Sequence, residues 1–427
     1  MKRKGLTAEK RIAALLLLPA LITIAVIAIW PVVRSFWISL YDVRLNNPTK
    51  SQIHQQPGLN VEKFAEVVPV LKRNIADASQ KADADTAVRL KELQAKVAGL
   101  QAMLEENESF ASTYEKVDAL LFEGQPVPEE IRVVTLTADE ADAVRKQVDA
   151  INRLAKPIAD ENIAGLVNGV NETLISPNFV GFAYYLSFLK DQRLMASLEN
   201  TFLFTVISVS LELVLGLFIA VLINRAFKGR GLVRAAVLIP WAIPTVVSAL
   251  MWKYLFDGQN GVVALLFEQV GIVEDMGLLL TTKAGSLSAV IFADVWKTTP
   301  FMALLLLAGL QTIPHSLYEA ADVDGAGKVQ QFFRITLPLL KSTILVALLF
   351  RTLDAFRIFD LVYVLTGGGP ANATETISIY AYKTMFAQMN FGEGSALSVI
   401  VFICVAIMSM IYVRLLGTDL VADGRNK

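Results

Sequence analysis

Four charged residues interrupt a long apolar stretch of the sequence between residues 339 and 365. They stand at every third position, as Arg351, Asp354, Arg357 and Asp360. A charge near the middle of a bilayer costs about 2.5 to 3.5 kcal/mol on insertion scales, so such residues usually pair or face a wet cavity. On one continuous helix each would reach the next, which favours an ion-pair ladder. The alternative is that some line a solute path, because carboxylates accept hydrogen bonds from hydroxyl groups and guanidinium groups donate them.

Three further ionisable residues lie in other apolar stretches and are weaker candidates for that path. Asp294 and Lys297 are three positions apart, so on one helix they would simply form a pair, and Glu212 lies in an earlier stretch. His54 has no cysteine or second histidine near it in the sequence, so we predict no metal site. The positions of the charged candidates in space depend on the membrane segments that contain them.

The composition is that of a membrane protein. Of the 427 residues 54% are hydrophobic and only 19% are charged, which is too apolar for an ordinary soluble domain. A helix needs about 20 apolar residues to cross a bilayer, and six segments meet or approach that length. They are residues 12–33, 201–223, 233–256, 286–310, 339–365 and 397–416. We therefore expect an all-α membrane protein with six spans.

The loop charges predict the orientation of these spans. Lysine and arginine in short loops tend to stay in the cytoplasm. The loop after the second span is basic, whereas the loop after the third is mainly acidic. The basic N-terminal residues suit an uncleaved anchor, because the first apolar stretch is too long for a signal peptide; they are Lys2, Arg3, Lys4, Lys10 and Arg11. Both termini should lie in the cytoplasm, as should loop 311–338.

Some functions are disfavoured by the same composition. A formal net charge of −1 gives no global basic surface, and the sequence lacks a zinc-finger spacing or an RNA-binding aromatic motif, so we expect no nucleic-acid partner. The single cysteine, Cys404, lies in an apolar run and cannot close a disulfide within the chain.

Residues 46–177 have a different composition from the rest of the chain. Charged residues and alanine dominate, and no membrane-length apolar run occurs before residue 201. Leucine and valine recur at steps of three and four between Leu90 and Leu104, which predicts a helix with one buried stripe. A second helix is expected from Ala138 to about Leu154. We predict three parts: residues 1–45 with the first span, an extracytoplasmic helical insertion at 46–177, and a core at 178–427.

The cytoplasmic loop 311–338 has the pattern of a helix, a tight turn and a second helix. Pro314 can start the first helix, Gly325 and Gly327 allow the chain to reverse, and Pro338 suits the start of the next helix. Such an element offers small residues for close approach and acids for pairing with a partner. A plain connecting loop is the alternative on physical grounds alone.

A family resemblance favours the interpretation that loop 311–338 docks on a partner protein. The string Glu319-Ala320-Ala321, then Gly325 and later Ile335-Thr336-Leu337-Pro338, resembles the signature loop of binding-protein-dependent ABC importer permeases. In that family the loop sits in a groove of the ATPase subunit. The resemblance therefore implies ATPase coupling through a set of loop residues. These are Glu319, Ala320, Ala321, Asp324, Gly325, Ala326, Gly327, Arg334, Leu337 and Pro338.

Other segments resemble the sugar-specific branch of that family, which includes the maltose and glycerol-3-phosphate permeases. They are Phe179 to Phe182, Pro240 to Pro244, Trp296 to Pro300 and Leu365 to Pro370. The resemblance implies a type I importer permease core and, by region only, substrate contacts in the fifth span at Asp354, Phe356, Arg357 and Asp360. Lys297 is a further candidate. Trp241 and Trp296 could stack on a sugar ring, although aromatic residues in spans more often pack or anchor at the interface.

The resemblance also implies partners. They are a second permease subunit, two ATPase subunits that carry ATP and magnesium, and an extracytoplasmic solute-binding protein, all at a bacterial inner membrane. This chain itself has no phosphate-binding loop, because the string from Gly325 to Val329 lacks the required first glycine and has valine after its lysine. We expect no cofactor and no catalysis by this chain. Insertion 46–177 does not visibly match the family and is either a spacer or a dock for an external partner.

Two other functions remain open from the sequence. An ion-coupled secondary transporter would use the intramembrane acids as ion sites and would need no ATPase. A membrane sensor would detect an external ligand with the insertion and signal through the cytoplasmic loop.

Overall fold

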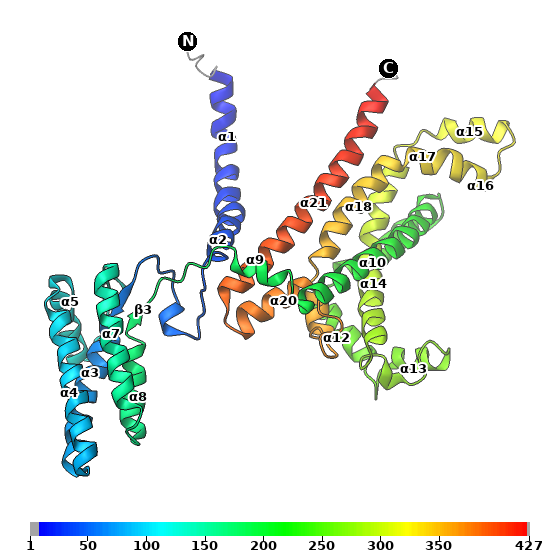
Figure 1. Ribbon diagram of the computed structural model, residues 1–427. Helices are drawn as coiled ribbons and strands as arrows, with labels where there is room; N and C mark the ends of the chain where they lie inside the picture. The colour runs from blue at the N-terminus through cyan, green and yellow to red at the C-terminus, as the bar shows by residue number, and fades with distance from the viewer. Residues whose placement is uncertain (1–7, 425–427) are drawn as a thin grey trace. The chain divides into compact units, whose positions relative to one another are not determined.

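The computed structural model describes residues 8–424, so the basic N-terminal residues Lys2, Arg3 and Lys4 lie outside the described part of the chain. The chain divides into two compact units. The first is Met1–Tyr184 with Gln388–Glu393, and the second is Tyr185–Ala387 with Gly394–Lys427. Helices make up most of both units, as expected from the sequence (Figure 1).

The first unit begins with a long apolar helix. It comprises α1 (Ala8–Ile24), a π-helical turn (Ala25–Ile29) and α2 (Trp30–Ile38). The segment Leu15–Ile38 is long and apolar enough to cross a membrane. This helix runs five residues beyond the predicted end at Val33, because no glycine or proline occurs between Val33 and Ile38.

Residues 58–175 of the first unit form a helical bundle around one apolar core. Its helices are α3 (Val61–Lys81), α4 (Ala84–Glu105), α5 (Glu108–Phe122), α6 (Glu129–Arg132), α7 (Ala138–Ala155) and α8 (Glu161–Asn171). The five longer helices each begin at a residue whose side chain accepts a backbone N–H of the first turn, an effective N-cap; these residues are Asn60, Asp83, Asn107, Thr137 and Asp160. The predicted stripe from Leu90 to Leu104 is buried in the core.

A small antiparallel sheet closes the bundle at its chain ends, a feature that the sequence did not predict. Strand β1 (Gly58–Asn60) lies between β2 (Val133–Thr135) and β3 (Leu174–Ile175). Gly58 pairs with Ile175, so the two ends of the bundle are neighbours. The strands are two or three residues long, too short for a recognisable alternating pattern.

Except for the first residues of α9 and of α21, which fall in the first unit, the remaining helices belong to the second unit. Its first part has α9 (Ala183–Phe188), α10 (Gln192–Asn224), α11 (Arg230–Ala242), α12 (Thr245–Leu255), α13 (Val262–Gln269) and α14 (Lys283–Leu310). Its second part has α15 (His315–Val323), α16 (Lys328–Gln331), α17 (Leu337–Leu339), α18 (Lys341–Phe356), α19 (Asp360–Leu365), α20 (Ile377–Tyr382) and α21 (Phe391–Gly424). Helices α10 and α14 pack closely along their length, and α18 packs against both.

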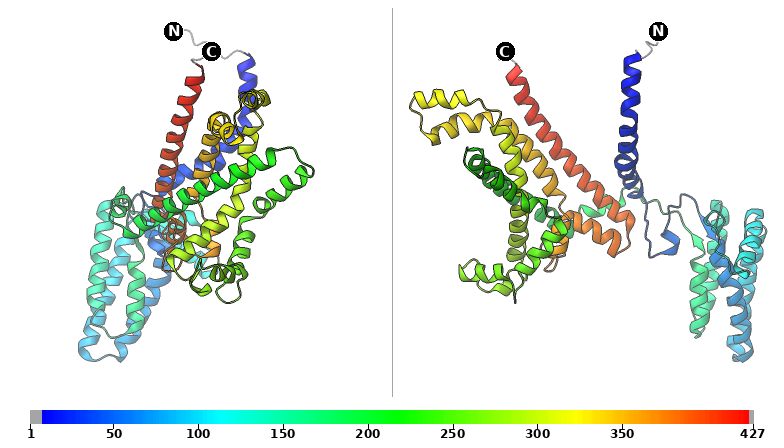
Figure 2. Two further views of the ribbon diagram at one scale, coloured as in Figure 1. Left: turned by 90° about the vertical axis from the view of Figure 1, so that its right-hand side faces the viewer. Right: turned by 180° about the vertical axis from the view of Figure 1, so that it is seen from behind.

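Four helices in the described residues are long and apolar enough to cross a membrane, or six spans if each of two bent pairs counts as one. The four are Leu15–Ile38, Gln192–Asn224, Lys283–Leu310 and Phe391–Leu415. One bent pair is α11 with α12, at 88°, and the other is Lys328–Leu339 with α18, at 65°. The second view of Figure 2 shows both bends in the second unit.

The third predicted span, residues 233–256, is therefore not one straight helix. Pro244 disfavours the helical conformation of the residue before it, and Ile243 is extended. The fifth predicted span, 339–365, also breaks: α18 ends at Phe356 and α19 starts at Asp360. Apolar length alone does not reveal such breaks, because each segment is long enough to be taken as a single span.

Candidate functional site

Arg351 is the centre of a buried charge cluster that joins three helices. Its side chain is 2% exposed, and its guanidinium group donates to both carboxylate oxygens of Glu212 at 2.5 and 2.7 Å. It also donates to Asp294 at 3.1 Å and to Asp354 at 2.9 Å. Glu212 comes from α10, Asp294 from α14, and Arg351 and Asp354 from α18. Buried charges of this kind are stable only when they are paired and hydrogen-bonded, so the cluster fixes the three helices relative to one another.

The predicted ladder along one helix is present in its first two steps and wrong at the third. Arg351 pairs with Asp354, and Arg357 lies 3.5 Å from Asp354, but the helix ends at Phe356. Arg357 therefore caps α18, and no ion pair to Asp360 is present among the described residues. The main partner of Arg351 is Glu212, which lies 139 positions earlier in the sequence. Spacing within a segment cannot predict a partner on another helix.

Lys297 does not pair with Asp294, which corrects the second sequence-based pairing. Its ammonium group instead donates to the main-chain oxygen of Ile243 at 2.5 Å, with Trp241 O at 3.5 Å. These carbonyls lie where α11 ends and α12 begins. A helix broken inside a membrane must have its freed carbonyls satisfied by the protein, and Lys297 supplies the donor from α14.

A polar cavity of about 570 Å³ lies beside this cluster, within the volume range of small-molecule sites. Its wall contains the break between α11 and α12, the polar turn of α14 and the break between α18 and α19. Five of the seven predicted solute-path residues line it, namely Trp241, Lys297, Asp354, Arg357 and Asp360. Asp294, Thr298 and Arg351 line it as well. The cavity thus presents both acceptors and charged donors to whatever enters it.

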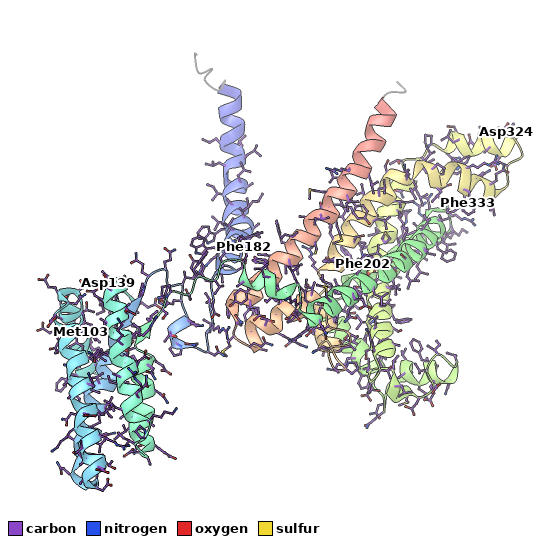
Figure 3. All side chains as sticks on the ribbon, in the orientation of Figure 1. Met103, Asp139, Phe182, Phe202, Asp324 and Phe333 are labelled. Carbon is purple, nitrogen blue, oxygen red and sulfur yellow. The ribbon has the colours of Figure 1, made fainter. Side chains whose placement is uncertain are left out.

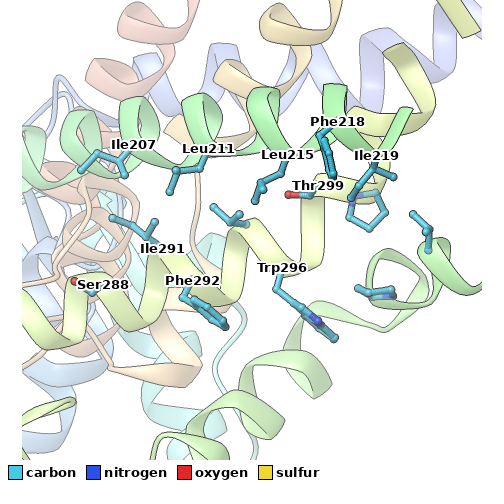
Figure 4. A pocket seen from close by; sticks show the side chains of 14 residues that line it. Ile207, Leu211, Leu215, Phe218, Ile219, Ser288, Ile291, Phe292, Trp296 and Thr299 are labelled. Carbon is cyan, nitrogen blue, oxygen red and sulfur yellow. The ribbon is translucent and has the colours of Figure 1, made fainter. Parts of the chain in front are cut away.

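Phe356 and Trp296 do not line this cavity. Phe356 is buried, 5% exposed. Trp296 lines a separate apolar cavity of about 840 Å³ between α10, α11 and α14 (Figure 4), and packs edge to face against Trp252. Trp241 does face the polar cavity, where it also stacks on Phe301 at 5.6 Å.

The loop 311–338 folds into an elbow that extends beyond α18, as Figure 1 and the second view of Figure 2 show. Pro314 is the cap residue of α15, as expected. Gly325 has a φ of +77°, a conformation that glycine adopts without strain, and the chain reverses there. Gly327 instead has an ordinary φ of −68° and caps α16. Pro338 stands in the first turn of α17.

The elbow is braced internally and leaves apolar side chains exposed. Lys328 and Gln331 both contact the Asp322 carboxylate, at 2.9 and 2.5 Å, and these hydrogen bonds hold the pKa of Asp322 below its usual value. Val323 is 88% exposed and Phe333 60%. Figure 3 shows Asp324 at the tip of the elbow and Phe333 on the returning limb. A rigid elbow with exposed apolar residues is suited to contact another protein.

A second buried carboxylate, which the sequence analysis missed, anchors the Gly-rich turn after α19. Glu375 accepts hydrogen bonds from Arg193 at 2.7 and 2.9 Å and forms an ion pair with Lys383 at 2.9 Å. Burial alone would raise the pKa of Glu375, but the hydrogen bonds from Arg193 and Lys383 outweigh it and lower that pKa. The sequence signal for this anchor is weak: Glu375 follows the Gly-Gly-Gly-Pro string by a few residues, but Arg193 lies far away in the sequence.

Comparison with known proteins identifies the family. Residues 212–420 match the family described as "Binding-protein-dependent transport system inner membrane component". The trehalose/maltose transport system permease protein MalF of Thermococcus litoralis is 46% identical over 238 residues, which are 55% of this chain and 79% of that protein. This chain belongs to that family. It is a permease component of an inner-membrane transport system and, like the family, a transport subunit rather than an enzyme.

Two more relatives of the permease have comparable coverage. The trehalose transport system permease protein SugA of Mycobacterium tuberculosis is 46% identical over 247 residues, 57% of this chain and 78% of that protein. The sn-glycerol-3-phosphate transport system permease protein UgpA of Agrobacterium fabrum is 33% identical over 241 residues, 56% of this chain and 81% of that protein.

The permease also has a solved structural neighbour. A chain of a bacterial ABC transporter involved in the import of the acidic polysaccharide alginate aligns with a TM-score of 0.51 and 24% identity. The alignment covers 56% of this chain and 84% of that chain. The likeness is one of fold, and it confirms the expected type I importer permease core. The family match starts at Glu212, so the helical bundle at residues 58–175 lies outside it.

Proposed function

We propose that the permease forms half of the translocation path of an ATP-driven carbohydrate importer. The polar cavity is the observation that carries this proposal, because it places charged donors and acceptors inside a bundle of apolar helices. Arg357 and Asp354 are 67% and 59% exposed at their side chains, so both can reach a solute hydroxyl. Relatives named for trehalose, maltose and glycerol phosphate support a sugar or a sugar-like solute.

The elbow is the proposed handle for the ATPase. A separate nucleotide-binding subunit, which carries ATP and magnesium, would receive the elbow in a groove and move it on hydrolysis. Exposed Val323, Val329 and Phe333 supply apolar contact area, and exposed Glu319 can pair with a cation of the partner. The brace around Asp322 supports this role, because force passes through an element only when the element is stiff.

The remaining partners and the orientation belong to the same proposal. A second permease completes the pore, two ATPase subunits act on the cytoplasmic side, and an external binding protein delivers the solute. A neighbour of the same fold has been solved with an alginate pentasaccharide-bound periplasmic protein, which supports a partner of that kind. Both termini would lie in the cytoplasm, and residues 46–177 outside. The insertion would then be placed to contact the binding protein.

The test uses two glycines of the elbow that differ in backbone conformation. Gly325→Val forces a branched side chain into a positive φ, which is strained whatever the free space. Gly327→Val is the matched control, since its φ is ordinary and no heavy atom lies within 4 Å of the added Cβ. In the copurified complex, reconstituted in liposomes, Gly325→Val should lower ATP-driven uptake about tenfold, and Gly327→Val should leave it within about twofold.

Uptake that is normal with Gly325→Val would remove the coupling role of the elbow. Uptake that needs no ATPase subunit and collapses with an ionophore would instead indicate an ion-coupled transporter. In that case the cavity acids would be ion sites.

A further inference from the structure

A row of four aromatic side chains lies beside the polar cavity of the permease. Phe359 is the cap residue just before α19, Tyr363 comes from α19, Tyr382 from α20, and Phe386 from the π-helical turn that follows it. Ring centroids are 4.9 Å apart for Phe359 and Tyr382 and 4.9 Å for Tyr382 and Phe386. Tyr363 and Phe386 remain 39% and 53% exposed. These two rings are therefore not part of the buried core of the chain.

The row borders a second hollow of about 310 Å³, and the two cavities share one wall residue. Phe359 lines the polar cavity, and with Tyr382 and Phe386 it also lines this second hollow. Ser378 and Ser398 line it too. The hydroxyl of Ser398 donates to Gly394 O and can still accept a hydrogen bond. The hydroxyl of Ser378 forms no hydrogen bond to another residue in the described part of the chain. The hollow therefore combines aromatic faces with a few polar groups, as small-molecule sites do.

We propose that this hollow, formed by Phe359, Tyr382, Phe386, Ser378 and Ser398, is a subsite for a second sugar ring. The negative face of an aromatic ring attracts the weakly positive C–H groups on one face of a pyranose. The serine hydroxyls then bond the hydroxyls at the rim of the ring. With one ring in the polar cavity and the next on the aromatic row, the permease takes solutes of at least two linked rings. This inference rests on the proposed carbohydrate function.

The test measures sugar binding directly, so that the selectivity of a binding protein does not enter. The full-length chain in lipid nanodiscs is titrated with trehalose and maltose as two-ring probes and glucose as a one-ring probe, followed by saturation-transfer NMR. Tyr382→Leu should weaken two-ring binding about tenfold and leave glucose binding within about twofold. Tyr382→Phe restores the ring face and should recover most of the lost affinity.

A second pair of variants guards against a folding defect at Tyr382. Phe386 is more than half exposed, so Phe386→Leu should fold normally and still weaken two-ring binding. Phe386→Tyr, which keeps the aromatic ring, should fold normally and leave two-ring binding unchanged. If the leucine and aromatic variants bind equally, or if glucose and the two-ring sugars lose affinity together, the row is packing or an interface belt and the subsite is refuted. If the wild-type chain binds none of the three sugars, the carbohydrate function itself fails. Glucose and two-ring binding that are equally tight in every variant would refute the subsite alone.

Discussion

Arg351 shows how one residue can control the interior of this permease. Its single guanidinium group faces carboxylates from Glu212, Asp294 and Asp354 and is almost fully buried. Removal of one partner from a buried cluster leaves uncompensated charge, which costs far more than the pair contributes in net stability. Arg357, six positions later, makes one long contact and is mostly exposed. The same residue type therefore has very different consequences at these two positions.

The two arginines make a matched pair for a stability measurement. Arg351→Leu should destabilise the permease by about 3 to 5 kcal/mol, because three carboxylates then share a site with no cation. Arg357→Leu should cost about 1 kcal/mol or less, as for an exposed ion pair. Unfolding of the detergent-solubilised protein, followed by tryptophan fluorescence, measures both. Similar losses for the two variants would contradict the burial argument.

At the scale of elements, breaks in the helices define the cavity. The α11–α12 break and the α18–α19 break both contribute to its wall, and each frees main-chain carbonyls. At the α11–α12 break Lys297 donates to the carbonyl of Ile243, and at the α18–α19 break Thr376 donates to the carbonyl of Ile358. The Gly-rich turn after α19 is then held by Glu375 between Arg193 and Lys383. Polar side chains on neighbouring helices thus stabilise each irregular segment.

Loss of the lysine donor should loosen the first break. Lys297→Met keeps the apolar stem but leaves the carbonyl of Ile243 without its donor, at an expected cost of about 1 to 3 kcal/mol. Hydrogen exchange of residues 241–245, measured by mass spectrometry, should increase. Lys253→Met, an exposed lysine on α12, is the control and should change neither quantity. Unchanged exchange in Lys297→Met would show that the proline alone fixes the break.

The Glu375 anchor predicts a pH dependence. The pKa of Glu375 is lowered in the folded state, so its contribution is fully present above the ordinary value of 4.5 and is lost as the pH falls below it. Wild-type protein should therefore lose stability more steeply than Glu375→Gln as the pH falls below about 4.5. Thermal unfolding across this range measures the difference. Glu66→Gln, at an exposed position, should follow the wild type, and parallel curves for all three would exclude the anchor.

At the scale of the whole molecule, the chain combines a membrane permease core with a helical bundle inserted at one point. The bundle has its own apolar core, with Leu59, Phe64 and Phe110 fully buried. Gly58 and Ile175 are paired neighbours, so the chain enters and leaves the bundle at adjacent points. Such ends are typical of domains that tolerate excision or insertion. The domain boundaries at residues 46 and 177 stay a prediction that this geometry favours.

Independent folding of the bundle can be measured. A fragment of residues 58–175 should be helical and unfold cooperatively, because its core needs no residue from outside that range. Phe64→Ala in the fragment should cost about 3 to 5 kcal/mol. The permease with these residues replaced by a short Gly-Ser linker should still insert and copurify with its partners. An unfolded fragment would mean that the bundle depends on the rest of the chain.

The sequence by itself determined the membrane class, the approximate spans, the elbow at residues 311–338 and the family. Hydrophobic length, helix periodicity, glycine and proline positions and motif spacing are local properties, so a single sequence carries them. Only the tertiary structure decided which charges meet. Arg351 pairs with Glu212 on another helix as well as with Asp354, Lys297 donates to the carbonyls of a broken helix, and Phe359 lines two cavities. Such contacts depend on how helices pack across the bundle, and distance along the chain gives no measure of that packing.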